Sequence, residues 1–235
     1  MKRIGLIGGV SPESTVIYYR LLNAAARQAY GGDSSADMVI QSLNFGYMHE
    51  LYRAADWTTF KKTVVGAAKN LENAGCDLIA ISSNTTQMSV FDVVDTVNVP
   101  VINLLDAVSA KVASVGSTNP LLLGTRMTME GEFYRPTMAE RYGLTTITPD
   151  TDDRIEVNRI IFDELCEGEI LGPSRKRYVE VIERGREQGA DGVILGCTEI
   201  GMLISQEHVD IPVFDTTKIH AAAIAEFAFA PTSVQ

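Results

Sequence analysis

The sequence is poor in the features that mark several large classes of protein. Its 235 residues include three cysteines, three histidines and one tryptophan. Three cysteines are too few, and an odd number, for a disulfide framework, so we expect a reducing, cytoplasmic environment. No run approaches the roughly 18 apolar residues that span a bilayer, and two glycines at positions 8 and 9 end the first apolar stretch too early for a signal peptide. Membrane proteins and disulfide-stapled secreted domains are therefore excluded.

Positive charge is also scarce. The chain has 20 Lys and Arg against 30 Asp and Glu, which gives a formal net charge of -10. Such a surface repels phosphate backbones and anionic lipids, so neither nucleic acid nor a membrane is an expected partner. The three histidines have no ligand spacing, so no metal is predicted. An anionic substrate would need local cations or backbone N–H groups to offset the mean field.

What the chain does have is a regular alternation of short apolar runs and longer stretches with helical periodicity. This pattern predicts parallel sheets covered by helices on both faces, with ligands bound where strands end. The length allows one or two domains. The apolar runs are residues 4–7, 38–40, 78–81, 99–102, 121–123, 192–195 and 211–214, and the helical stretches include 14–30, 57–74, 155–167, 174–189 and 217–229.

The chain also repeats itself. Residues 74–85 align with residues 188–199, 114 positions later, and two further segment pairs match in the same order. Three ordered matches at a nearly constant offset predict two similar α/β halves. We expect a first domain of residues 1–100 plus 214–235 and a second of residues 101–213. Facing each other, the halves would bring positions 83 and 197 to opposite sides of one ligand.

Cys197 is the leading candidate for chemistry, because it follows an apolar strand and precedes a predicted helix. A helix N-terminus can lower the pKa of a thiol. Gly196 lets a ligand approach the backbone closely. The competing interpretation is a buried cysteine that packs as a small hydrophobe.

Ser83 occupies the equivalent turn of the first half, followed by Asn84 and Thr85. These side chains can cap a helix, hold a carboxylate, or do both. A serine is a poorer proton acceptor than a thiolate. Thr125, in the matching turn after residues 122–124, would face the same ligand. Arg53 either binds a carboxylate with two hydrogen bonds or is a solvated surface arginine.

The residues carrying these features resemble the aspartate/glutamate racemase family. The resemblance rests on residues 4–15, on the Ser83–Thr86 turn and on residues 196–200, and it extends over the whole chain. It implies a cofactor-independent enzyme, commonly a homodimer, with two pseudo-symmetric three-layer α/β domains, mainly parallel sheets and the active site in the cleft between them. In this family two cysteines exchange the substrate α-proton, and the second corresponds to Cys197.

The first family cysteine, usually followed by Asn-Thr-Ala-His, is replaced here by Ser83, and the histidine by Gln87. The chain thereby resembles the L-aspartate/glutamate-specific subgroup, which carries a hydroxyl residue at the first position. Some members bind substrate with a lysine near position 166, where this chain has Cys166. The resemblance implies that a dicarboxylic amino acid is held by Asn84, Thr85, Thr125 and Thr198, with Val10, Ser11 and Arg53 at its edges.

The resulting prediction is a racemase for aspartate, glutamate or both. Cys197 would act as α-proton base or acid, with Ser83 in the position of the second base. Two alternatives remain open. One is a single-cysteine enzyme similar to the arylmalonate decarboxylases. The other is a catalytically weak amino-acid-binding homologue, either natural or a Cys-to-Ser variant.

Overall fold

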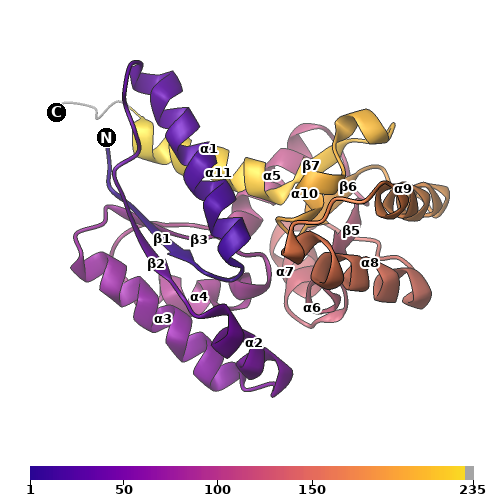
Figure 1. Cartoon of the computed structure of the whole chain (residues 1–235), viewed down its shortest axis with the longest axis horizontal. Helices are drawn as coiled ribbons and strands as arrows, with labels where there is room; N and C mark the ends of the chain where they lie inside the picture. The colour runs from indigo at the N-terminus through magenta and orange to yellow at the C-terminus, as the bar shows by residue number, and fades with distance from the viewer. Residues whose placement is uncertain (231–235) are drawn as a thin grey trace. The chain divides into compact units, whose positions relative to one another are not determined.

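The computed structural model describes residues 1–230, which divide into two compact units (Figure 1). The first unit contains Met1–Leu104 together with the chain from His220 onward, and the second contains Leu105–Ile219. Each unit has one parallel sheet flanked by helices. The predicted fold class of two parallel-sheet α/β domains is therefore confirmed.

The sheet of the first unit has the strand order β2-β1-β3-β4. Its strands are Met38–Ser42 (β2), Ile4–Gly8 (β1), Leu78–Ile81 (β3) and Val101–Ile102 (β4). The two central strands are apolar and buried along their whole length, as expected when helices cover both faces.

Side-chain alternation along β1 divides the helices of the first unit between the two faces of the sheet. Ile4 and Leu6 share a core cluster with α1 (Pro12–Tyr30) and α11 (Thr216–Phe229). Gly5, which lies between them, faces the side chain of Leu71 on α3 (Trp57–Asn73). A strand presents successive residues to opposite faces, so α1 and α11 cover one face and α3 the other.

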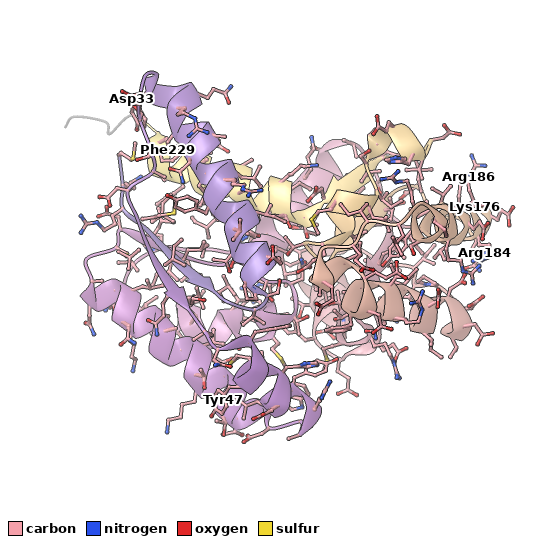
Figure 2. The ribbon with its side chains drawn as sticks, viewed as in Figure 1. Asp33, Tyr47, Lys176, Arg184, Arg186 and Phe229 are labelled. Atoms are coloured by element: carbon pink, nitrogen blue, oxygen red, sulfur yellow. The ribbon has the colours of Figure 1, made fainter. Side chains whose placement is uncertain are left out.

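The sheet of the second unit has the order β5-β6-β7, formed by Leu121–Gly124, Val193–Gly196 and Val213–Asp215. Helices α8 (Thr151–Asp163) and α9 (Gly172–Glu187) share a core cluster with β5 and β6. Buried Asp153 on α8 forms ion pairs of 2.7 Å with Arg177 and Arg184 of α9, the second of which is labelled in Figure 2. These pairs fix one end of α8 against α9.

The remaining helices are short apart from α5, and one predicted helix is shorter than expected. The stretch 155–167 was predicted as one helix, whereas α8 ends at Asp163 and Cys166 lies in a separate 3-10 turn. The break occurs because Glu164 leaves the helical region with φ -126°. The other helices are α2 (Phe45–Arg53), η1 (Thr85–Ser89), α4 (Val90–Val94), α5 (Leu104–Ser114), α6 (Arg126–Glu130), α7 (Tyr134–Tyr142), η2 (Leu165–Glu167), α10 (Ile200–Leu203) and η3 (Gln206–His208).

The two units repeat one strand order, and the first is completed by a helix from the far end of the chain. Strands β1, β3 and β4 correspond to β5, β6 and β7, while β2 is an addition to the first sheet. The chain leaves the first unit at the start of α5 and returns to it within α11. The expected boundaries at 100/101 and 213/214 lie slightly before these crossings, and residues 231–235 of the expected first domain lie outside the described residues.

A search of the described helices finds none with the length and apolar character needed to cross a membrane.

Candidate active site

The loop between β1 and α1 lies against the Ser83 turn. Ser11 accepts a hydrogen bond from the Ser14 N–H at 3.2 Å and so begins α1. The Ser14 hydroxyl then donates to the Ser82 carbonyl at 2.5 Å. This bond ties the first turn of α1 to the residue that precedes Ser83, and half-buried Val10 and buried Ser11 lie in the loop just before that turn.

Gly9 allows this loop to follow its path. Its φ is 85°, and a Cβ at this position would lie 2.1 Å from the Leu43 carbonyl oxygen. Its N–H donates to the Thr15 hydroxyl at 2.8 Å. Any larger residue would push the loop away from β2, because the close contact is with backbone.

Ser83 begins the turn after β3, and its hydroxyl oxygen accepts two hydrogen bonds from one residue. The Thr86 N–H donates to it at 3.3 Å and the Thr86 hydroxyl at 3.0 Å. The side chain of Ser83 is nearly buried, with 8% of its surface exposed. Ser83 therefore accepts a backbone N–H at the start of the turn, although the residue that directly precedes η1 is Asn84. Buried Asn84 and half-buried Thr85 follow it in the same turn.

Gln87, at the position of the family histidine, is fully buried and ties the turn to the strand. Its Nε2 donates to the carbonyl oxygens of Ile81 and Ser83 at 3.0 and 3.2 Å. An amide does not titrate near neutral pH, so Gln87 holds the shape of the turn but does not act as an acid or a base.

Arg53 is the last residue of α2 and its side chain is exposed. Between residues 1 and 230 no ion pair involves Arg53, and no hydrogen bond joins it to the Ser83 turn. Burial, together with the charge of Arg53, lowers the pKa of His49 one helical turn earlier. Tyr47 is also exposed on this helix (Figure 2).

In the second unit, Thr125 and Cys197 directly follow two glycines that are paired in the sheet. Gly124 pairs with Gly196, and a Cβ on Gly196 would lie 2.9 Å from the Leu123 carbonyl oxygen. This close packing places the starts of the two turns side by side. Thr125 then repeats the geometry of Ser83, since it accepts a bond of 3.3 Å from the Thr128 N–H and its hydroxyl lies 3.2 Å from that of Thr128.

Cys197 is partly exposed, and its thiol donates a hydrogen bond to a buried carboxylate. The distance from Sγ to Glu199 Oε2 is 2.9 Å, and Glu199 is 3% exposed. Burial and the negative charge of Glu199 raise the pKa of the Cys197 thiol well above its usual value. The thiol is therefore protonated at neutral pH, with its proton directed at an acceptor. Thr198, between the two residues, is buried.

The direction of this shift is opposite to the one predicted for a thiol at a helix N-terminus. Helix α10 has only four residues, so its dipole is small, whereas desolvation and the adjacent carboxylate both favour the neutral thiol. The prediction that Cys197 lies at a strand end before a helix is correct, but the predicted influence on its pKa is wrong.

One element of the site was missed, although the sequence contains a signal for it. A Ser/Thr residue followed three positions later by another occurs after β1, β3 and β5, as Ser11/Ser14, Ser83/Thr86 and Thr125/Thr128. In each pair the first side chain accepts the N–H of the second. Thr128 was not identified because this spacing is common at ordinary helix starts. Among residues 1–230, no group of three or more His, Cys, Asp or Glu residues could hold a metal ion.

Comparison with known proteins shows which families and structures the whole chain is similar to. The model of the family described as Asp/Glu/hydantoin racemase matches residues 7–224. Among curated proteins, the broad specificity amino-acid racemase RacX of Bacillus subtilis (strain 168) is 22% identical over 221 residues, which cover 91% of this chain and 92% of RacX.

Solved structures give the same result. A candidate Asp/Glu racemase from Yersinia pestis is 41% identical with a TM-score of 0.90, and the match covers 97% of this chain and 99% of that one. An aspartate racemase homologue from Pyrococcus horikoshii OT3 is 39% identical with a TM-score of 0.86 and the same coverage. The resemblance read from the sequence and the prediction of a racemase are confirmed, and the chain belongs to the Asp/Glu/hydantoin racemase family.

Proposed function

We propose that the chain is a cofactor-independent racemase of aspartate, glutamate or both, and that Cys197 and Ser83 transfer the α-proton. One observation carries the proposal. The equivalent turns of the two units each present a protic side chain, and the two side chains are hydrogen-bonded in opposite senses. The Cys197 thiol donates to a carboxylate, whereas the Ser83 oxygen accepts from two donors.

The reaction begins with the proton shared between Cys197 and Glu199. When the S–H bond breaks, Glu199 takes the proton and a thiolate forms. The thiolate then removes the substrate α-proton, so that a new S–H bond forms as the Cα–H bond breaks. Inversion requires a proton to arrive on the opposite face of the planar carbanion. Ser83 supplies it, leaving an alkoxide that takes a proton from solvent, while Glu199 releases its extra proton to solvent and the starting state is restored.

This chemistry makes the two half-reactions unequal. The pKa of an alcohol far exceeds that of a thiol, so the reverse reaction must begin from a rare alkoxide. The equilibrium constant of a racemisation is one, so kcat/KM for inversion is nevertheless equal for both enantiomers. The inequality appears when the substrate α-hydrogen exchanges with solvent without inversion, because the thiol catalyses this exchange for only one enantiomer.

We further propose that the substrate is bound by hydroxyl, amide and backbone groups more than by side-chain cations. The supporting observation is composition, because most of the proposed contact residues are neutral and the net charge is -10. Arg53 is the one cation among them. The homodimer and the cytoplasmic location remain predictions. The proposed contact residues are Val10, Ser11, Arg53, Asn84, Thr85, Thr125 and Thr198.

The test is a racemisation assay on both enantiomers of aspartate and glutamate, followed by circular dichroism in deuterated solvent. We expect inversion from either enantiomer and rapid α-deuterium uptake without inversion from only one. Cys197→Ala is expected to abolish both signals. Fast exchange from both enantiomers, or activity that survives Cys197→Ala, would refute the assignment of Cys197 and Ser83.

A second candidate function is a decarboxylase that uses a single thiol. It is favoured by the observation that only one of the two equivalent turns carries a cysteine, because protonation of one face needs only one acid. Release of carbon dioxide from substituted malonates, without inversion of aspartate or glutamate, would establish it. A binding protein would show affinity for an amino acid without either activity.

A further inference from the structure

Thr86 is the residue whose contacts bear most directly on what Ser83 can do. We propose that Thr86 is a positioning residue that enables Ser83 to act as the proton donor, by directing both its hydroxyl and its N–H at the Ser83 oxygen. This inference rests on the proposed racemase function. It concerns a position where the usual family sequence, Cys-Asn-Thr-Ala-His, has an alanine, whose side chain cannot donate a hydrogen bond.

The geometry leaves the Ser83 proton available. Its oxygen receives hydrogen bonds of 3.3 Å from the Thr86 N–H and 3.0 Å from the Thr86 hydroxyl. A hydroxyl has one proton to donate and can accept two bonds. Both acceptor positions of Ser83 are therefore occupied, and its own O–H is directed at no acceptor among residues 1–230. Ser83 is 8% exposed, so the residue is nearly but not completely covered by its neighbours.

These two bonds matter most after the proton has left. Loss of the Ser83 proton forms a C–H bond on the substrate and leaves a negative oxygen on Ser83. Hydrogen bonds to an ionised group are about twice as strong as those between neutral groups. Both donors are already in place, so stabilising the alkoxide needs no rearrangement. Thr86 therefore lowers the barrier to proton donation while making neutral Ser83 a weaker base.

Capping explains only one of the two bonds. A residue that begins a helical turn needs a single side-chain oxygen to accept one N–H, and the Thr86 N–H satisfies that requirement. The bond from the Thr86 hydroxyl is additional. Because Thr86 is 1% exposed, solvent does not replace this bond when it is removed.

The test compares Thr86→Val with Thr86→Ser. Valine keeps the shape and the capping N–H but loses the hydroxyl, whereas serine keeps both donors. For Thr86→Val we expect kcat/KM for inversion to fall about 10- to 100-fold in both directions, the effect of removing one hydrogen bond to a charged group. Exchange without inversion, which depends on Cys197, should remain within about twofold of the wild-type rate. Thr86→Ser should restore inversion.

The second unit offers a matched control. Thr128 makes the same pair of contacts with Thr125, at 3.3 and 3.2 Å, but Thr125 is proposed to bind substrate and not to donate a proton. Thr128→Val therefore removes the same group from the same kind of turn. It should change inversion and exchange together, leaving their ratio at the wild-type value. Thermal unfolding of both valine variants checks that they fold.

Two outcomes would overturn the proposal. One is an unchanged ratio of inversion to exchange in Thr86→Val, and the other is a similar change of that ratio in Thr128→Val. Ser83→Ala separates this failure from failure of the proposed function. If Ser83→Ala loses inversion but keeps exchange while Thr86→Val changes neither, Ser83 donates the proton without help from Thr86. If Ser83→Ala keeps full inversion, the proposed role of Ser83 itself is wrong.

Discussion

The turn after β3 and the turn after β6 follow equivalent strands of the two sheets. Their side chains Ser83 and Cys197 are nevertheless hydrogen-bonded in opposite senses. At the first, the Ser83 oxygen is surrounded by donors, so the arrangement favours loss of its proton to a substrate. At the second, the Cys197 thiol donates a hydrogen bond to the buried carboxylate of Glu199, so this carboxylate can accept the thiol proton. In the proposed mechanism, the internal repeat preserves the order of the strands while its two copies take different parts in one reaction.

The difference extends to the residues around the turns. Gly196 is packed so tightly against β5 that it has no room for a side chain, whereas Ser82 at the equivalent position donates its hydroxyl to the Ile7 carbonyl oxygen at 3.0 Å. A second contrast lies between helices α11 and α5. Fully buried His220 in α11 comes 112 positions after fully buried Val108 in α5, which is close to the offset of the repeat. Each contrast can be tested by making one unit resemble the other.

The largest effect is expected from Glu199→Gln, which removes the acceptor of the thiol proton. The pKa of Cys197 should fall, because one of the charges that raises it is gone, yet both exchange and inversion should fall about 10²- to 10⁴-fold, as when a general base is lost. Iodoacetamide alkylation against pH measures the first effect and deuterium uptake the second. Glu199→Asp, which keeps the carboxylate, is the control. A rise in exchange would show that Glu199 only suppresses the thiolate.

A smaller effect, on stability, is expected at His220. Its ring nitrogens lie 2.9 Å from the Tyr18 hydroxyl and 2.8 Å from the Ile102 carbonyl oxygen. Burial lowers the pKa of His220 to about 4. The unfolded chain therefore binds a proton at His220 near pH 6.5, whereas the folded chain does so only near pH 4. The contribution of His220 to the free energy of unfolding is therefore fully present above pH 6.5 and decreases as the pH falls from 6.5 to 4. The loss should reach about 3 kcal/mol.

Urea unfolding at several pH values measures this contribution, and His220→Val provides the comparison with the second unit. The variant is less stable at neutral pH because it leaves the Tyr18 hydroxyl and the Ile102 carbonyl oxygen without their partner. Its unfolding free energy should nevertheless vary less between pH 6.5 and pH 4. An unchanged pH dependence would show that other groups are responsible.

The next effect is expected from Gly196→Ser, which gives the second turn the residue of the first. The new Cβ would lie 2.9 Å from the Leu123 carbonyl oxygen, so strands β5 and β6 must separate slightly, at a cost of about 1–3 kcal/mol. The reciprocal change, Ser82→Gly, removes one hydrogen bond and should cost about 1 kcal/mol. Thermal unfolding ranks the two variants, and equal stability would contradict the tight packing at Gly196.

The smallest effect is expected from Ser83→Cys, which makes the two turns chemically alike. A thiol gives up its proton more readily than a hydroxyl, so inversion should rise about tenfold. Exchange without inversion should then appear for the second enantiomer as well. Ser83→Thr, which keeps a hydroxyl, serves as control. If Ser83→Cys leaves both rates unchanged, proton transfer at position 83 does not limit turnover.

Most of the fold could be predicted from the sequence because its strands are buried and its repeat is explicit. Each predicted apolar run overlaps a strand, and the ordered matches at offsets near 114 correspond to strands in the same order in both sheets. The end of α8 could not be predicted, since residues up to 167 keep a helical pattern of side chains. The break comes from the backbone conformation of Glu164, which that pattern does not record.

The places of the candidate residues at strand ends could be predicted from the sequence, but their electrostatics could not. Residues that follow strand ends can be identified from the sequence, which is how Cys197 and Ser83 were found. The pKa of Cys197 depends instead on two facts that the sequence does not contain: helix α10 has only four residues, and the Glu199 carboxylate folds back onto the sulfur. Thr86 was noted only as a polar neighbour, because the direction of its hydroxyl is a tertiary feature.

The return of the chain to the first unit within α11 has a consequence for biosynthesis. The second unit is one continuous stretch, Leu105–Ile219, so all its residues are available before the C-terminus is made. The first unit must wait, because Ile224 and Ala228 of α11 cover Ile4 and Leu6 of β1. As the ribosome adds residues from the N-terminus, the part made first is therefore completed last. Until then, an apolar face of β1 and β3 is exposed, and a chaperone that binds nascent chains would find its target on the first unit.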